Sequence, residues 1–129
     1  MLRRLMIGMA FGLVLLADAT LKGALGLDMD QARKVDAIQA KYRQPFAAKR
    51  QDQNREMRVL RRARIANDSA GVAAQETVVN RLQGELQEIR KQEDEEIRRV
   101  LTPAQQVKFE EYLKLRKEMI GSSRDDSAN

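Results

Sequence analysis

The fold is decided by a short stretch near the middle of the chain, which reads Asn67-Asp68-Ser69-Ala70-Gly71. These residue types favour turns, because Asn, Asp and Ser bond to their own backbone and Gly tolerates conformations closed to other residues. On both sides lie long stretches in which apolar residues recur every three or four positions, the period of an α-helix. A short turn between two long helices brings them together in opposite directions. The sequence therefore predicts an all-α protein built on an antiparallel helical hairpin.

The first arm of this hairpin is predicted over residues 28–66. Pro45 interrupts it, since proline cannot donate to the carbonyl of Lys41 and crowds the preceding turn. We therefore expect a kink or a break near Gln44. The apolar residues of the arm follow one helical stripe that weakens where the sequence becomes strongly basic: Val35, Ile38, Tyr42, Phe46, Met57 and Leu60.

The second arm is predicted over residues 72–101 and a short C-terminal helix over residues 103–120. Thr102-Pro103 separates the two helices, because the residue before a proline avoids the helical region. Glu93 occupies the one position of the second arm where an apolar residue is missing. The other positions keep the helical spacing: Val78, Leu82, Leu86, Ile89, Ile97, Val100 and Leu101.

The segments outside this helical domain, which is predicted over residues 20–120, differ in composition. Residues 20–26 contain two glycines and are expected to be flexible. Residues 121–129 are rich in Ser and Asp and are expected to form a disordered tail.

The first 19 residues have the composition of a secretory signal peptide. Arg3 and Arg4 precede 13 uncharged residues, 5–17, and Ala17-Asp18-Ala19 fits the small-x-small cleavage pattern. The uncharged run is shorter than the roughly 20 apolar residues of a membrane span. An uncleaved anchor or an apolar N-terminal helix is the alternative. We expect export, with membrane contact only through this signal before its cleavage.

The composition disfavours most enzymes and most metal sites. The chain has no Cys and no His, so it lacks thiolate ligands, the commonest metal ligand and the usual general base near pH 7. It also lacks a Gly-rich phosphate loop. We therefore expect no enzymatic activity, no cofactor and no metal site, and we interpret the acidic cluster of residues 93–96 as a solvated face.

The charges are unevenly distributed along the hairpin. Residues 41–64 contain nine Lys and Arg against two acids, and residues 85–96 contain six acids against two basic residues. A turn near residue 69 pairs positions whose numbers sum to about 138, which places Arg43 level with Glu95 and Arg50 level with Glu88. We expect these charges to neutralise each other across the hairpin.

The basic residues nearer the turn face a nearly uncharged stretch and should remain a cationic patch. Such a patch could bind nucleic acid, anionic lipid or acidic protein segments. Export and the lack of interleaved aromatic residues disfavour nucleic acid. The residues that we expect to contact an acidic partner are Arg55, Met57, Arg58, Leu60, Arg61 and Arg62.

Two similar motifs mark helix starts 74 residues apart. In Leu101-Thr102-Pro103-Ala104-Gln105, the Thr102 hydroxyl can accept from the amide of Gln105, whose side chain can reach back to the amide of Thr102. This is a capping box, with proline at the first helical position, where a missing donor costs nothing. Leu27-Asp28-Met29-Asp30-Gln31 repeats the plan with Asp28 as the cap and Gln31 as its partner.

The signal, the helical hairpin and the paired Leu-Thr-x-x-Gln-type motifs resemble the Spy/CpxP-like family of bacterial periplasmic proteins, over about residues 27–119. Its relatives include ZraP- and CnrX-like heavy-metal resistance proteins. The second motif matches well, and the first has Asp28 where Thr is usual. The resemblance implies an elongated periplasmic homodimer with a basic concave face that holds unfolded clients without ATP.

The resemblance leaves two functions open. The first is an ATP-independent chaperone or envelope stress protein that binds unfolded or acidic clients through the basic helical face. The second is a periplasmic regulator of a sensor kinase or of a heavy-metal resistance system. The metal sites of the relatives do not carry over, because this chain has no His. A homodimer is also expected because a thin hairpin cannot bury its apolar stripe alone.

Overall fold

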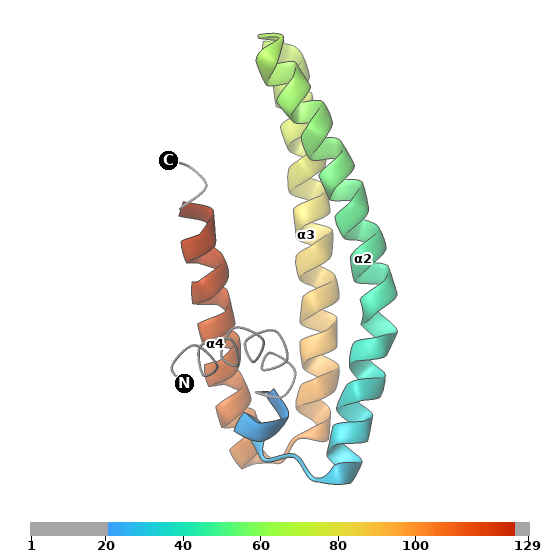
Figure 1. Ribbon diagram of the computed structural model, residues 1–129, viewed down its shortest axis with the longest axis vertical. Helices are drawn as coiled ribbons and strands as arrows, with labels where there is room; N and C mark the ends of the chain where they lie inside the picture. The colour runs from blue at the N-terminus through green and yellow to red at the C-terminus, as the bar shows by residue number, and fades with distance from the viewer. Residues whose placement is uncertain (1–20, 126–129) are drawn as a thin grey trace, which may run out of the picture. The chain divides into compact units, whose positions relative to one another are not determined.

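The computed structural model describes residues 21–125, with side chains up to residue 119, and confirms the predicted all-α hairpin. The long arms are α2 (Met29–Ile65) and α3 (Ser69–Val100), which run side by side in opposite directions (Figure 1). α4 follows over Pro103–Asp125, and residues 21–25 form one further helical turn. No strand is present among the described residues. The predicted signal over residues 1–19 lies outside them.

The described residues form two compact units. The hairpin unit comprises Lys34–Arg99, and the terminal unit comprises residues 21–33 together with residues 100–125. Within residues 21–125, no helix is both long enough and apolar enough to span a membrane.

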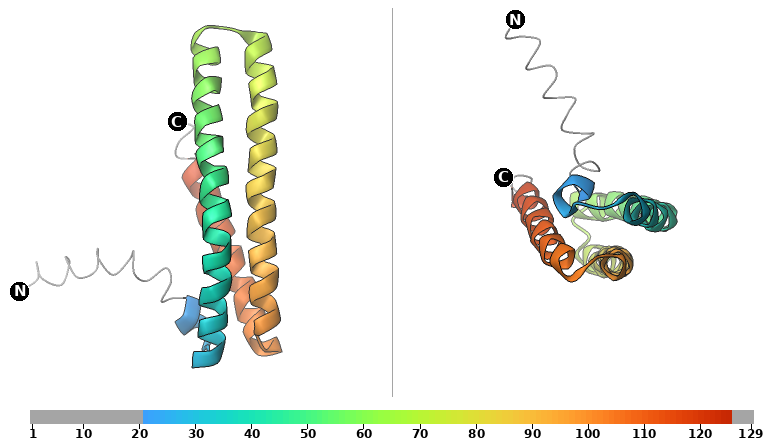
Figure 2. Two further views of the ribbon diagram at one scale, coloured as in Figure 1. Left: turned by 90° about the vertical axis from the view of Figure 1, so that its right-hand side faces the viewer. Right: turned by 90° about the horizontal axis from the view of Figure 1, so that it is seen from below.

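The turn of the hairpin closes as its sequence requires (Figure 2). Asn67 adopts a left-handed conformation with φ of 54°, and the Asp68 amide donates to the carbonyl of Ala63 at 3.0 Å, which completes a Schellman-type helix end. The Asp68 carboxylate then accepts from the amide of Gly71 at 3.0 Å and caps α3. A Cβ atom at Gly71 would meet the Asp68 carboxylate, so a larger residue at this position would require the Asp68 side chain to move.

α2 is continuous through Pro45, so of the expected kink or break near Gln44 the break does not occur, and the kink stays a prediction. A proline removes one backbone hydrogen bond, but contacts with α3 on both sides of it hold the arm together. Lys41 and Lys49 both form ion pairs with α3, and the Arg90 guanidinium lies 4.4 Å from the centre of the Phe46 ring. Tertiary contacts therefore outweigh the local penalty.

The inner surface of the hairpin is only partly apolar. Its buried side chains are Val35 and Leu60 of α2 with Leu82, Leu86 and Ile97 of α3. Nearer the turn, polar pairs join the arms. The Gln53 amide donates to Gln83 at 2.6 Å, and the Gln75 amide donates to the backbone carbonyl of Glu56 at 3.1 Å and to its carboxylate.

The terminal unit corrects two expectations about the ends of the domain. Residues 20–26 were expected to be flexible, yet Leu21 and Leu25 are buried together with Leu101 and Phe109. α4 continues to Asp125, five residues past its predicted end. Residues 121–125 include glycine and serine, which only weaken a helix, and no proline, which would break it. The predicted tail is therefore helical over residues 121–125, and residues 126–129 lie outside the described part.

Candidate interaction surface

Two lysines and one arginine of α2 form ion pairs with α3, and the arginine, Arg64, lies beside the turn. Lys41 Nζ lies 2.9 Å from Glu96 Oε1, and Lys49 Nζ lies 2.9 Å from Glu85 Oε2. The paired numbers sum to 137 (41 + 96) and 134 (49 + 85), close to the predicted 138. The expected pairs of Arg43 with Glu95 and Arg50 with Glu88 are wrong, because neither arginine forms an ion pair among the described residues.

The rotation of α2 explains this difference. Successive residues turn by about 100° around a helix, so Arg43 lies about 200° from Lys41, and Arg50 about 100° from Lys49. Both lysines therefore turn towards α3, and both arginines turn away from it. The register was predictable from the turn, but the rotation of the arm was not.

Interactions across the hairpin change the pKa values of Lys41, Glu85 and Glu96. Hydrogen bonding from the Tyr42 hydroxyl and then from Lys41 lowers the pKa of Glu96, and the hydrogen bond to Glu96 raises the pKa of Lys41. The hydrogen bond from Lys49 lowers the pKa of Glu85. All four acids of residues 93–96 are half-buried, and Glu96 also bonds to α2, so the solvated face expected for this cluster is wrong.

In the part of α2 that belongs to the hairpin unit, residues 34–65, five arginines without an ion pair among the described residues lie on the outward side, and we call this surface the arginine face. All five are exposed, and they fall within a sector of about 120° around the helix. No acidic residue of α2 between positions 43 and 65 shares that sector. The arginine face consists of Arg43, Arg50, Arg58, Arg61 and Arg62.

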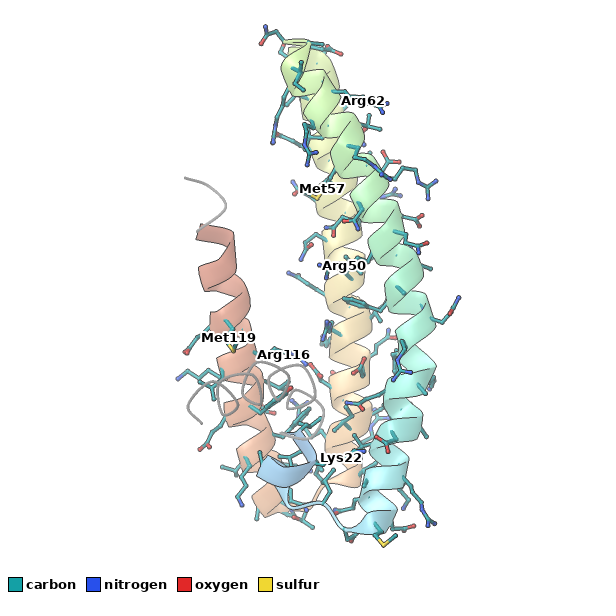
Figure 3. All side chains as sticks on the ribbon, in the orientation of Figure 1. Lys22, Arg50, Met57, Arg62, Arg116 and Met119 are labelled. Atoms are coloured by element: carbon teal, nitrogen blue, oxygen red, sulfur yellow. The ribbon has the colours of Figure 1, made fainter. Side chains whose placement is uncertain are left out.

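Two apolar side chains lie in or beside the arginine face. Ile65 is 76% exposed and lies within its sector, and Met57 is 44% exposed and lies at its edge. Figure 3 labels Met57 between Arg50 and Arg62 along α2. The face therefore combines guanidinium groups with accessible apolar groups.

Two of the predicted contact residues do not belong to this face. Arg55 Nη2 pairs with Asp52 Oδ1 at 2.5 Å, because residues three apart are neighbours on a helix. Leu60 is buried against α3 and is only 6% exposed. Met57, Arg58, Arg61 and Arg62 are exposed as expected, whereas Arg43 and Arg50 were missed because they were assigned to ion pairs.

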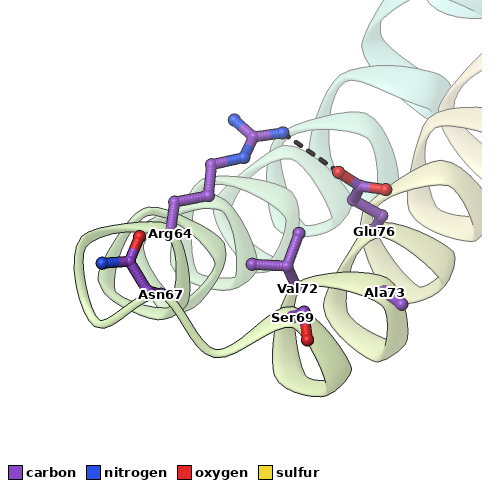
Figure 4. Close-up of a pocket in the computed structure, with 6 residues that line it drawn as sticks. All are labelled: Arg64, Asn67, Ser69, Val72, Ala73 and Glu76. Carbon is purple, nitrogen blue, oxygen red and sulfur yellow. Dashed lines mark hydrogen bonds and ion pairs between the residues drawn. The ribbon is translucent and has the colours of Figure 1, made fainter.

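An open hollow of about 360 Å³ lies at the turn (Figure 4). Arg64 on its wall pairs with Glu76 at 3.3 Å, so the charges of the hollow largely compensate each other. Its other lining residues are small or neutral: Asn67, Ser69, Val72 and Ala73. Because Glu76 neutralises it, Arg64 does not contribute to the predicted cationic patch.

Both capping boxes form the predicted reciprocal hydrogen bonds. The backbone amide of Gln31 donates to Asp28 Oδ1 at 2.7 Å, and the backbone amide of Asp28 donates to Gln31 Oε1 at 3.2 Å. The corresponding distances between Gln105 and Thr102 are 3.3 and 2.9 Å. Of the leucines that precede the caps, Leu101 is buried and Leu27 half-buried.

The two boxes also meet, which the sequence did not predict. Gln31 Nε2 donates to Gln105 Oε1 at 2.7 Å, and Gln105 Nε2 donates to Gln31 Oε1 at 3.1 Å. The remaining amide hydrogens go to backbone carbonyls, from Gln31 to Val100 and from Gln105 to Gly26, both at 3.2 Å. Each side-chain amide thus uses two donors and two acceptor positions, which is its full capacity.

This junction explains why both motifs end in glutamine. A capping box accepts Glu as readily as Gln. A glutamate, however, has no amide hydrogens, so it would face the oxygen of the opposite glutamine and leave a backbone carbonyl unbonded. The motif is therefore a tertiary contact as well as a helix start.

The residues present offer little to a metal ion. Among residues 21–125, no three acidic side chains lie close enough together to hold one. The scattered methionines of this part, Met29, Met57 and Met119, are exposed on different stretches of the chain.

Comparison with known proteins adds no relative. Neither a protein-family model, nor a curated protein, nor a solved structure matches the chain.

Proposed function

We propose that the protein is a periplasmic chaperone that works without ATP and holds unfolded or acidic protein segments on its arginine face. The observation that carries this proposal is the group of five exposed arginines on α2, none of them in an ion pair among the described residues. Periplasmic location rests on the signal-like residues 1–19 and on the family resemblance.

The charges of the arginine face would act first. Guanidinium groups attract acidic segments over distances of about one Debye length, so association is fast and weakens as salt is added. Met57 and Ile65 then offer apolar contact to an unfolded segment once it is close. Weak contacts of both kinds let the client dissociate without an energy source.

A homodimer remains part of the proposal, with one restriction. Pairing two arginine faces would bring ten like charges together without an acid of α2 between them, which is unfavourable. A second copy would therefore have to use another surface, and the arginine face would stay open to clients.

The test is suppression of client aggregation by the full chain. Replacing Arg50, Arg58 and Arg61 by Gln gives the face variant, which keeps good helix formers at each position. Replacing Arg81, Lys91 and Arg99 by Gln on the exposed side of α3 removes the same charge and gives the α3 control variant. We expect the face variant to lose most protection of an acidic unfolded client and the control to keep it.

The opposite outcome is equally clear. If the face variant protects the client as well as the wild type, and protection does not change between about 50 and 500 mM salt, the arginine face is not the client site. A pull-down from envelope extract that recovers a sensor-kinase domain through this face would favour the regulatory function.

A further inference from the structure

The arginine face contains no lysine. Lys41 and Lys49 turn towards α3 and pair with acids, as Arg64 does near the turn, whereas the five outward cations of residues 43–65 are all arginines. A guanidinium group is planar, can bind two oxygens of one phosphate, and is less strongly hydrated than an ammonium group. The outward side of the arm is therefore suited to phosphate oxygens.

The arginines are also arranged along a line. They extend from Arg43 to Arg62 on one continuous helix, a length of about 29 Å at 1.5 Å per residue. Because the helix holds them in one sector, they could contact several anionic groups of a flat surface together. A small soluble anion would occupy only one or two of them.

The apolar residues of the same sector point to the kind of surface. Ile65 and Met57 are exposed beside the guanidinium groups. Clusters of about four to eight Lys and Arg on a helix are typical of surfaces that bind anionic lipid headgroups. We propose that the arginine face binds the surface of a bilayer containing anionic phospholipids. Lipid phosphates would contact the guanidinium groups, and Met57 and Ile65 would enter the headgroup layer.

This proposal goes beyond chaperone activity and beyond the expectation that only the signal contacts a membrane. Arg43 and Arg50 make the difference, because they extend the basic surface from the turn along more than half of the arm. An acidic protein segment would satisfy the charges and use the apolar residues as well, but an unfolded client does not require the arginines to lie along one continuous helix, whereas a flat array of phosphates does.

The test is flotation of the full chain with vesicles, without any client. One set contains phosphatidylglycerol and phosphatidylcholine, and the other contains phosphatidylcholine alone. Apolar residues 5–17 are present in every variant and could bind both vesicle types, so the readout is the ratio of binding to the two vesicle types. We expect a large ratio for the wild type at about 50 mM salt and a small one at about 500 mM.

The variants separate the arginine face from overall charge. Each arginine near an anionic surface contributes about fivefold to binding, so the face variant should bind anionic vesicles about 100-fold more weakly. The α3 control variant, with the same net charge, should keep most of the binding. Replacing Arg50, Arg58 and Arg61 by Lys should lower binding several-fold, because charge remains but two-oxygen contacts are lost.

The proposal is overturned if the wild type does not distinguish the two vesicle types, or if the face variant binds like the α3 control variant. A wild type that protects clients but ignores anionic vesicles would show that the arginine face binds protein only, and the proposed function would stand. A wild type that binds anionic vesicles but does not protect clients would support the lipid site and contradict the proposed chaperone function.

Discussion

The terminal unit and the hairpin unit are both helical, but different interactions stabilise them. The terminal unit, residues 21–33 and 100–125, buries Leu21, Leu25, Leu101 and Phe109 and joins its helix starts through two fully bonded glutamines. The hairpin unit buries five apolar side chains over two arms of more than 30 residues and relies on ion pairs and amide contacts between them. Burial and side-chain amide bonds thus stabilise the terminal unit, whereas the hairpin unit has fewer buried contacts for its length and exposes charge on its outer side.

The largest expected effect is at the centre of the terminal unit. Phe109 is 1% exposed, and Phe109→Ala should lower the free energy of unfolding by about 3–5 kcal/mol, because it removes the largest buried side chain and leaves a cavity. Urea unfolding followed by circular dichroism measures the loss. Hydrogen exchange should accelerate more in α4 than in Lys34–Arg99, and uniform acceleration would contradict the division into two units.

The matching change in the hairpin unit is Leu86→Ala. Leu86 is 5% exposed, and its truncation should cost about 2–5 kcal/mol, with the lower part of this range expected because the partly polar interior can admit water. The same urea titration applies. A loss larger than that of Phe109→Ala would show that the hairpin, and not the terminal unit, is the more tightly packed region.

A smaller effect is expected at the glutamine junction. Gln105→Glu keeps the capping box but removes two donors, so it should destabilise the protein by about 1–3 kcal/mol. Gln87→Glu on the exposed side of α3 is the matched control and should change stability little. Equal stability of the two variants would mean that the junction contributes nothing beyond capping.

The ion pair at Glu96 should make the hairpin sensitive to acid. The pKa of Glu96 lies below its ordinary value of 4.5 in the folded protein. A carboxyl group with a lowered pKa contributes stability above the unfolded pKa and loses it as the pH falls through the folded pKa. At pH 7, Glu96→Gln should therefore have a lower Tm than the wild type, and the difference should vanish as the pH falls from about 5 to below the folded pKa. Glu88→Gln, at an exposed position, should show no such dependence.

The smallest expected effect on stability is that of the face variant. Arg50, Arg58 and Arg61 are exposed and form no ion pair among the described residues, so each substitution by Gln should change the free energy of unfolding by no more than about 0.5 kcal/mol. Thermal unfolding in parallel with the binding assays provides the check. A strongly destabilised face variant would mean that these arginines support the hairpin.

Much of the fold was accessible from local patterns. The turn at residues 67–71, the two arms and both capping boxes depend on residues within a few positions of each other, and their boundaries were predicted within a few residues. Pro45 does not break α2, and residues 21–25 are not the flexible segment expected, for one reason: a local preference was overruled by contacts with distant residues.

The candidate surface was only half predictable. Arg58, Arg61 and Arg62 were identified by their lack of opposing acids. Arg43 and Arg50 were missed because the sequence indicates which charges lie level across the hairpin but not which side of the helix each one occupies.

The sequence by itself determined the helices, their caps and the register of the hairpin, because turn residues and helical periodicity act over short separations. Only the tertiary structure decided how α2 rotates against α3, and that rotation turned Lys41 and Lys49 towards α3 and left Arg43 and Arg50 exposed. It also decided that Gln31 and Gln105, 74 positions apart, bond to each other. Both outcomes depend on side-chain packing between distant segments, which local sequence does not specify.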